Sequence, residues 1–403
     1  MKKIISKTVW ILGFVSLFND ISSEMLIPIM PIFLKSIGFT AFLIGLLEGF
    51  AEATAGLSKG YFGYLSDKYN TRKPFVSSGY FLSTLSKPML ALSIYPLWIF
   101  LARFFDRFGK GIRTSARDAI LSDQATAQTK GRIFGFHKGM DTTGAVIGPL
   151  ISLLLLTFYD VSYQTIFLVA FAPSLVGFLL TLFVKEKKSE HKVKKSIPGF
   201  FTFVKYWKEA SPDYKKAVIG FLAFGVINSS DLFLLLMIKN ITNSDQDVLM
   251  VYIFYNVVFA ATSYPMGAIA DKIGFKKSYV IGLIIFAIVY GVMSTSPSLY
   301  VIYGLFLLYG LYASLNESVS KAWIASIVHT KIATALGFFT GFNSVCLLLS
   351  STIAGLIWTS FGAPVMFAYA GAGAIIVAAY LLITFRGQSF KVDGKYIEPA
   401  EEQ

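Results

Sequence analysis

The residues best suited to bind a charged solute lie in residues 103–118, RFFDRFGKGIRTSARD, a stretch flanked by hydrophobic sequence. A helix advances about 100° per residue, so six charged side chains here share an arc of roughly 120°, opposite phenylalanine and alanine. A charge near the middle of a bilayer costs about 2.5 to 3.5 kcal/mol, so the six are expected to face protein, water or a solute. They are Arg103, Asp106, Arg107, Lys110, Arg113 and Arg117.

Carboxylates in the hydrophobic stretches could carry protons. Six of them are candidates for proton coupling: Asp20, Glu24, Glu48, Glu52, Asp106 and Asp141. An arginine keeps its charge and grips a carboxylate or phosphate with two parallel hydrogen bonds. Competition between a proton and an anionic solute for the same groups would couple their fluxes.

A structural lattice of ion pairs is the alternative role for these charges. Five acids are balanced by five bases, so all of them could be paired: Asp20, Glu24, Glu48, Glu52 and Asp106 against Lys59, Arg103, Arg107, Lys110 and Arg113. Buried ion pairs seldom add net stability, because desolvation offsets much of the attraction. This favours a functional role.

The composition predicts an all-α polytopic membrane protein. Of 403 residues, 55% are hydrophobic and 15% charged, against about 25% charged in soluble domains. Stretches of about 20 apolar residues can span a bilayer as helices. We count twelve, at residues 8–34, 42–65, 74–93, 97–117, 133–158, 164–184, 216–238, 248–270, 278–294, 299–324, 332–358 and 364–385.

Several classes of site are not expected in this sequence. Cys346 is the single cysteine and there are three histidines, so we expect no disulfide framework, no metal site and no cofactor. The spans hold no HExxH, no serine–histidine set and no phosphate-binding glycine loop, so an enzyme is not expected. The net charge of +13 is attributed to cytoplasmic loops, not to nucleic-acid binding.

The positive charges organise the chain. Lysines crowd a long loop between the sixth and seventh spans, whereas loops on the other face carry few bases, which places both termini and this loop in the cytoplasm. The expected organisation is a six-helix bundle at 1–184, a Lys-rich cytoplasmic linker at 185–215, a second six-helix bundle at 216–386 and a cytoplasmic tail at 387–403.

The two halves repeat one loop motif. GYLSDKYNTRKP begins at Gly63 and GAIADKIGFKKS begins at Gly267, an offset of 204 residues. This doubled motif resembles the loop signature of the major facilitator superfamily, and the likeness covers essentially the whole chain. The resemblance implies two pseudo-symmetric bundles, parallel repeats of the kind found in transporters. It implies a cytoplasmic gate of Gly63, Asp67, Lys68, Arg72, Arg113, Arg117, Gly267, Asp271, Lys272 and Glu317.

Two further stretches resemble motifs of that family. Gly135, Gly144, Gly148 and Pro149 resemble the antiporter motif of exporter branches, although its terminal glycine pair is missing; helix packing explains the four residues equally well. The family's arginine motif normally continues with glutamine and glycine, where this chain has Asp106 and Arg107. That departure argues against a cavity for lipophilic cations, because such a cavity should not be lined with positive charges.

In the family, the first, fourth, seventh and tenth spans surround the cavity. From their charge and hydrogen-bonding groups, Arg103, Arg107, Lys110 and Asn19 are expected to bind the solute, and the resemblance places Arg107, Asp231 and Asn316 on spans that surround the cavity. The expected function is secondary transport of a small anionic or zwitterionic solute by alternating access, coupled to protons. Export of a drug, metabolite or metal chelate, and a transport-inactive sensor or scaffold, are the alternatives. The expected setting is a monomer in the lipid bilayer of a prokaryotic cytoplasmic membrane.

Overall fold

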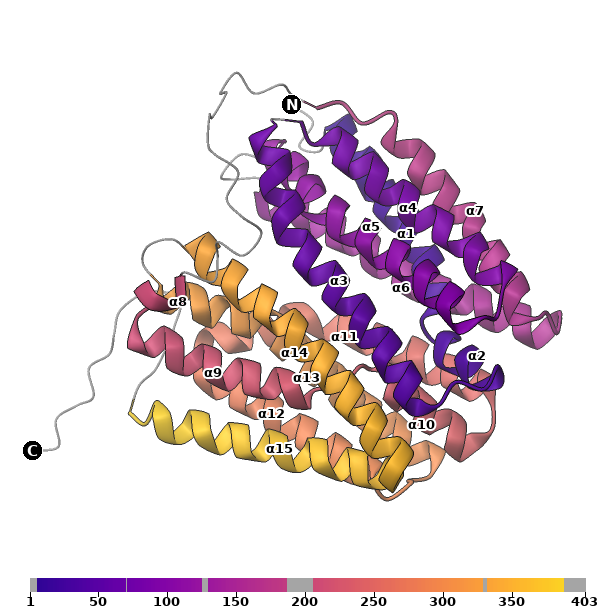
Figure 1. Ribbon diagram of the computed structural model, residues 1–403. Coiled ribbons are helices and arrows are strands. Elements are labelled where there is room, and N and C mark those ends of the chain that lie inside the picture. Colours follow the sequence, from indigo (N-terminus) through magenta and orange to yellow (C-terminus); the bar gives the residue numbers. More distant parts are fainter. Residues whose placement is uncertain (1–5, 70, 125–129, 187–205, 329–331, 388–403) are drawn as a thin grey trace, which may run out of the picture. The chain divides into compact units, whose positions relative to one another are not determined.

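The protein, seen in a computed structural model, is helical almost throughout (Figure 1). The structure describes residues 6–69, 71–124, 130–186, 206–328 and 332–387. The chain forms two compact units. Unit 1 comprises Met1–Phe39, Phe50–Gly199 and Ser244–Ile253, and unit 2 comprises Thr40–Gly49, Phe200–Asn243 and Phe254–Gln403.

The helices follow the predicted spans closely. Those of the first half of the chain are α1 (Lys7–Leu26), α2 (Met30–Ser36), α3 (Ala41–Lys68), α4 (Lys73–Leu92), α5 (Pro96–Asp123), α6 (Lys130–Phe158) and α7 (Tyr163–Thr181). Those of the second half are α8 (Tyr206–Glu209), α9 (Pro212–Ile227), α10 (Leu232–Thr242), α11 (Asp245–Ile273), α12 (Phe275–Met293), α13 (Leu299–Ile327), α14 (Ile332–Phe361) and α15 (Ala363–Thr384).

The prediction of an all-α polytopic membrane protein is confirmed. Within the described ranges, ten segments are long and apolar enough to cross a membrane. They do not include α4 and α5, the latter of which holds the charged stretch. The count of twelve spans stays a prediction. The Lys-rich part of the linker, 187–205, and the tail from 388 onward lie outside the described residues.

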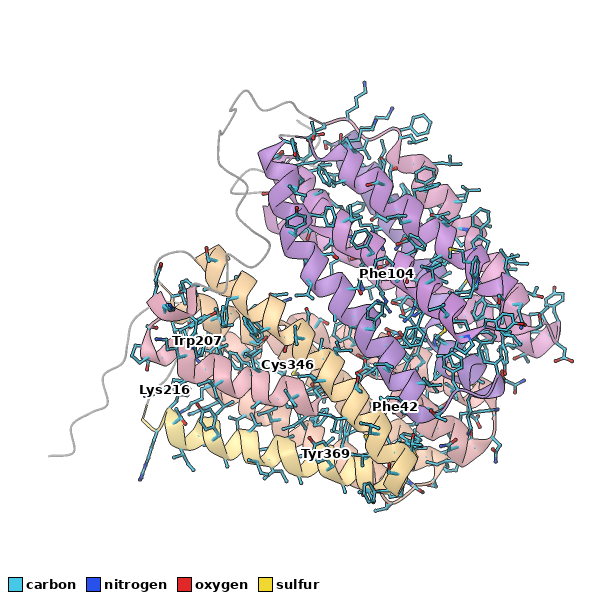
Figure 2. The ribbon with its side chains drawn as sticks, viewed as in Figure 1. Phe42, Phe104, Trp207, Lys216, Cys346 and Tyr369 are labelled. Carbon is cyan, nitrogen blue, oxygen red and sulfur yellow. The ribbon has the colours of Figure 1, made fainter. Side chains whose placement is uncertain are left out.

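Two long helices contribute to both units. The start of α3, up to Gly49, belongs to unit 2, where the Phe42 amide donates to Thr359 Oγ1 of α14 at 3.1 Å (Figure 2). The start of α11, up to Ile253, belongs to unit 1, where Asp245 accepts a hydrogen bond from the Tyr163 hydroxyl of α7. The compact units therefore differ from the sequence halves at these two segments.

Two of the predicted spans are broken by non-helical turns. The span predicted at 8–34 divides after Leu26 and resumes at Met30, where Pro28 and Pro31 lack the amide hydrogen that a continuous helix needs. The span predicted at 216–238 divides after Ile227 and resumes at Leu232. Its intervening residues are Asn-Ser-Ser-Asp, whose side chains compete with the helix for backbone hydrogen bonds. The first break lies in the last third of the apolar segment Lys7–Ser36, whereas the second lies near the middle of the segment Pro212–Thr242.

The apolar side of α5 packs against α3, as its sequence predicts. Phe104 stacks on Phe108 with ring centroids 5.2 Å apart and on Phe50 of α3 at 6.1 Å (Figure 2). The ring of Phe108 also meets Phe62 of α3 edge-on at 5.4 Å. This aromatic contact orients the charged side of α5 away from the stacked rings.

Candidate functional site

Glycines bring α4 and α5 of unit 1 into backbone contact. A Cβ atom on Gly79 would lie 2.6 Å from the Gly109 carbonyl oxygen, and one on Gly109 would lie 2.4 Å from the Gly79 carbonyl oxygen. Ser83, one turn beyond Gly79, donates its hydroxyl to the Asp106 carbonyl oxygen at 3.0 Å. Small residues at such an interface let helices approach closely. The charged groups beyond them are therefore held side by side.

A buried ion cluster lies at this interface. Lys87 Nζ of α4 lies 3.0 Å from Asp106 Oδ1, and Arg103 Nη1 lies 3.7 Å from Asp106 Oδ2. Lys87 is only 1% exposed, Arg103 4% and Asp106 7%. Sequence reasoning placed Asp106 among the proton carriers and left Lys87 out of the site. Lys87 could have been found from the sequence, because it is a lysine inside the apolar stretch 74–93.

One part of the ionic stripe on α5 remains accessible. Arg107 Nη1 pairs with Glu52 Oε1 of α3 at 2.9 Å, and the Glu52 side chain is 38% exposed. Lys110, one turn further along α5, is also exposed. Gly111 backs onto Ser58 of α3, where an added Cβ would lie 2.5 Å from the serine Cβ. That close packing of α3 on α5 positions the Arg107–Glu52 pair.

The acids of α1 lie against glycines of α6. A Cβ on Gly144 would lie 2.9 Å from Asp20 Cβ, and one on Gly148 would lie 3.0 Å from Glu24 Cβ. Pro149 lies within α6. The surroundings of Gly135 are outside what the structure describes. The stretch that resembles an antiporter motif is thus the surface that holds the two carboxylates of α1 in place.

A polar network joins α1, α5 and α6 one turn away. Asp141 of α6 accepts a hydrogen bond from Ser16 of α1, and the Ser16 hydroxyl in turn accepts one from Arg117 Nη1 at 3.4 Å. His137 Nδ1 lies 3.7 Å from Asp141 Oδ2. Within the electrostatic range of Asp20 lie Asp141 and Glu24. Three carboxylates thus share one region of unit 1.

Two neighbours of the α1 acids complete this region. Asn19 Nδ2 donates to Asp20 Oδ1 at 3.4 Å, and the Tyr252 hydroxyl of α11 donates to Glu24 Oε2 at 2.7 Å. Asn19 was predicted from the sequence. Tyr252 was not, because a tyrosine in an apolar span carries no charge to distinguish it.

The predicted cytoplasmic gate is described only in part. The side chains of Asp67, Lys68, Asp271 and Glu317 lie outside the described residues, so the expected pairing of Asp67 with Arg113 or Arg117 stays a prediction. Arg113 donates to Ser83 and lies over the Tyr80 ring, 4.5 Å from its centroid.

The remaining gate residues have the following surroundings. Arg117 Nη2 pairs with Asp118 at 2.9 Å, Arg72 pairs with Asp123, and Lys272 is exposed. The Arg72 and Lys73 amides donate to Glu186, which ties the start of α4 to the chain that follows α7. An added Cβ on Gly63 would lie 2.7 Å from Ser115 Cβ, whereas one on Gly267 would meet nothing within 4 Å.

In unit 2 the predicted site residues lie among tyrosines. The Tyr309 hydroxyl of α13 donates to Asp231 Oδ1 at 2.5 Å, and Asn316 Nδ2 donates to the Tyr312 hydroxyl at 3.2 Å. The Tyr309 ring lies 5.5 Å from that of Tyr255 and 5.3 Å from that of Tyr312. Sequence reasoning missed the tyrosines, although Tyr309 and Tyr312 share one helical face.

Glu48 lies one helical turn before Glu52 on α3. It is 3% exposed and lies in the part of α3 that belongs to unit 2. There, an added Cβ on Gly49 would lie 2.9 Å from the Leu348 carbonyl oxygen of α14.

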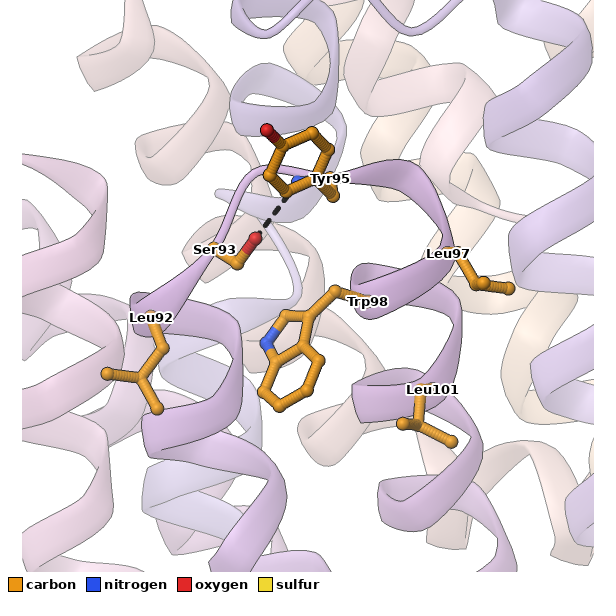
Figure 3. Close-up of a pocket in the computed structure, with 6 residues that line it drawn as sticks. All are labelled: Leu92, Ser93, Tyr95, Leu97, Trp98 and Leu101. Carbon is orange, nitrogen blue, oxygen red and sulfur yellow. Dashed lines mark hydrogen bonds between the residues drawn. The ribbon is translucent and has the colours of Figure 1, made fainter.

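A surface hollow of about 550 Å³ lies where α4 meets α5 (Figure 3). Its lining is mostly apolar: Leu92, Ser93, Tyr95, Leu97, Trp98 and Leu101. Trp98 Nε1 donates to the Met89 carbonyl oxygen at 2.6 Å, and amphipathic rings of this kind favour the membrane–water interface. The hollow lacks the charges that a polar solute needs, and its apolar lining suits contact with lipid. Among the residues that the structure describes, no group of three or more His, Cys, Asp and Glu could hold a metal ion.

Comparison with known proteins identifies the family. The family model of the Major Facilitator Superfamily matches residues 12–255 and 217–398. The uncharacterized MFS-type transporter MJ1317 of Methanocaldococcus jannaschii is 35% identical over 391 residues, 94% of this chain and 95% of that protein. The multi-drug resistance efflux pump PmrA of Streptococcus pneumoniae is 27% identical over 192 residues, 46% of this chain and 47% of that protein.

Solved structures show the same fold. The crystal structure of the nucleoside transporter NupG aligns with a TM-score of 0.77 and 13% identity, over 94% of this chain and 100% of that one. At that identity the likeness concerns the fold alone. The family and fold are those of transporters and not of enzymes, so the predicted fold class and the resemblance are both confirmed. The chain belongs to the major facilitator superfamily of membrane transporters.

Proposed function

We propose that the chain is a secondary active transporter that moves a small anionic or zwitterionic solute by alternating access, with protons as the coupling ion. The observation that carries the proposal is the Arg107–Glu52 pair, in which a buried guanidinium meets a carboxylate that is 38% exposed. A guanidinium binds carboxylate and phosphate groups alike. A solute anion can therefore take the place of the Glu52 carboxylate.

Proton binding to Glu52 supplies the coupling step. A protonated Glu52 no longer attracts Arg107 as an ion, so Nη1 of Arg107 becomes available to a solute carboxylate or phosphate. Lys110, exposed on the next turn, adds a second positive charge for the same anion. The buried cluster around Asp106 fixes α5 during this exchange, because Lys87 and Arg103 hold that carboxylate from two sides.

The carboxylates of α1 and α6 are proposed as further proton-linked groups. Asp20 is close enough to Glu24 and to Asp141 for each of them to act on it electrostatically. Like charges repel strongly in a medium of low dielectric constant, and binding of a proton relieves that repulsion. Gly144 and Gly148 keep two of these acids against α6, so a movement of α1 on α6 would alter their spacing.

The remaining assignments complete the proposal. The two copies of the loop motif, which begin at Gly63 and Gly267, are proposed to form the gate that opens on the cytoplasmic side. The Lys-rich linker at 185–215 and both termini are placed in the cytoplasm by the positive-inside rule. The reported relatives are prokaryotic, which supports a prokaryotic cytoplasmic membrane. A monomer is proposed, with lipid and the solute as its partners and no nucleic acid.

A ligand screen followed by an arginine variant tests the anion site. Purified protein is screened against a metabolite library by thermal shift at two pH values, and the best anionic hit is titrated against Arg107→Ala. Loss of a charge-assisted pair should weaken binding by at least about tenfold. Arg386→Ala, at an exposed position near the end of α15, serves as the control. Equal affinity in Arg107→Ala and wild type would remove Arg107 from the solute site.

The coupling role of Asp20 is tested with the same solute in proteoliposomes. Asp20→Asn should abolish uptake driven by a pH gradient but spare exchange of solute for solute, because exchange needs no net proton movement. A wild-type response to the gradient in this variant would exclude Asp20 as a proton carrier. A protein that only senses or scaffolds would show no flux under any gradient.

Drug export is the second candidate function. The likeness to PmrA, whose name describes a multi-drug efflux pump, covers 46% of this chain and supports this alternative. A drug exporter would lower ethidium accumulation in cells, and Arg107→Ala would leave that activity intact. The proposed transporter of anionic or zwitterionic solutes would not change ethidium accumulation, because ethidium carries no anionic group.

A further inference from the structure

The broken helix of unit 2 carries a feature that the anion site does not explain. Between α9 and α10 the residues Asn228 to Asp231 are not helical, near the middle of the 31-residue apolar segment Pro212–Thr242. Non-helical backbone at membrane depth is tolerated only where protein buries it or where it lines a water-filled cavity. Discontinuous transmembrane helices commonly form the binding sites of transporters near the middle of the membrane.

An exposed carboxylate stands at this break beside tyrosine rings. Asp231 is exposed and accepts the Tyr309 hydroxyl at 2.5 Å. Tyr290 and Tyr312 lie within electrostatic range of the same carboxylate, but these two rings and that of Tyr309 are buried. The ring of Tyr255, half-buried, lies 5.5 Å from that of Tyr309. A carboxylate at this depth must face protein, water or a ligand, because lipid contact is too costly.

The buried atoms of the break add a second sign of a polar ligand. Asn228 Oδ1 is inaccessible to solvent and makes no hydrogen bond with any residue that the structure describes. The Asn228 carbonyl oxygen, by contrast, accepts the Ser350 hydroxyl at 2.8 Å. The backbone of the break is thus fastened to α14, while a side-chain acceptor of the same residue is left for another donor.

We propose that Asp231 and the tyrosines around it form a binding site for an organic ammonium group. Electron-rich ring faces attract cations, and aromatic cages that recognise quaternary ammonium ions are built this way. The carboxylate adds opposite charge, and the rings favour an organic cation over a small hydrated metal ion. The proposal deepens the proposed function: the site selects solutes that carry a positive amine.

The experiment uses choline and its uncharged analogue, in which a carbon atom replaces the nitrogen. The two have the same shape, so a difference in binding reports the charge alone. Both are titrated against the full-length purified protein by saturation-transfer NMR, which measures weak affinities. Wild type should bind choline at least about tenfold more tightly than the analogue, as expected for a desolvated cation on aromatic rings.

Matched variants locate the site. Asp231→Asn should abolish the preference for choline, and Tyr255→Leu should reduce it several-fold, while Tyr255→Phe, which keeps the ring, should retain it. Asp160→Asn is the control, because Asp160 lies in an exposed loop with a positive φ angle that asparagine also adopts. Size-exclusion profiles and thermal unfolding of each variant identify any that fail to fold.

Three outcomes would overturn the proposal. Equal binding of choline and its analogue would indicate a site for a neutral molecule. A preference that survives Asp231→Asn would place the cation elsewhere. Stabilisation by sodium chloride that Asp231→Asn removes, without any choline binding, would indicate an inorganic cation site. The anion site is judged separately, because Arg107→Ala is scored on an anionic solute and leaves unit 2 unchanged.

Discussion

Asp106 in unit 1 and Asp231 in unit 2 are membrane-depth carboxylates that are held by different means. In unit 1, Asp106 is held by Lys87 and Arg103, so charge meets charge inside the bundle. In unit 2, Asp231 receives a neutral tyrosine hydroxyl. An ion cluster of low exposure cannot be opened cheaply, because each partner would be left as a buried charge. A phenol that releases a carboxylate is neutral and is not itself left as a buried charge. This suits a site that exchanges ligands.

The repeated loop motif shows the same contrast in packing. Gly63 of α3 lies so close to Ser115 of α5 that an added Cβ would fall 2.7 Å from the serine Cβ. Its counterpart Gly267 of α11 has open space around the same position. A motif that repeats in sequence therefore does not impose the same helix contact in both halves. The first copy is a packing site as well as a loop signature.

The largest expected effect concerns the ion cluster of unit 1. Lys87→Met leaves a carboxylate without its nearest cation and should lower the free energy of unfolding by about 3 to 5 kcal/mol. The matched control is Arg72→Ala, whose pair with Asp123 is partly exposed and should contribute about 0 to 1 kcal/mol. Unfolding in mixed micelles by added dodecyl sulfate measures both. Equal losses would mean that burial does not distinguish the two pairs.

The next effect compares the glycines of the two motif copies. Gly63→Ala forces α3 away from α5 and should destabilise the protein by about 1 to 3 kcal/mol, as overpacking does. Gly267→Ala meets no neighbour and should be neutral or stabilising by up to about 1 kcal/mol, because alanine favours helix over glycine. The same unfolding assay ranks them. If Gly267→Ala were the more damaging substitution, the contrast between the copies would be wrong.

Much of the fold and part of the site could be predicted from the sequence. Twelve apolar stretches, the doubled loop motif and the ionic side of α5 follow from composition and helical periodicity. The break after Ile227 could not be predicted, because a hydropathy window averages four polar residues into a long apolar segment. Tyr309 and Tyr252 were also missed, since their roles depend on contacts with carboxylates far along the chain.

The division of the charged stretch required three-dimensional contacts. Periodicity places Arg103, Asp106, Arg107 and Lys110 on one side of a helix but cannot say which of them meet a partner helix. The glycine contact brings α4 against α5, so that Lys87 of α4 pairs with the buried Asp106. Arg107 instead pairs with Glu52 of α3, whose side chain is partly exposed. The stripe thus has a buried portion and an accessible one.

The central claim is that a proton and a solute anion exchange at the Arg107–Glu52 pair. Its most direct test is the affinity of the anionic solute from the screen, measured for wild type and Glu52→Gln from about pH 4, where glutamate ordinarily takes up a proton, to about pH 8. Glutamine mimics the protonated carboxyl. The variant should therefore bind the anion at wild-type strength or tighter at every pH, whereas wild type should weaken as the pH rises. Loss of binding in Glu52→Gln, or a pH profile identical to that of wild type, would contradict the account.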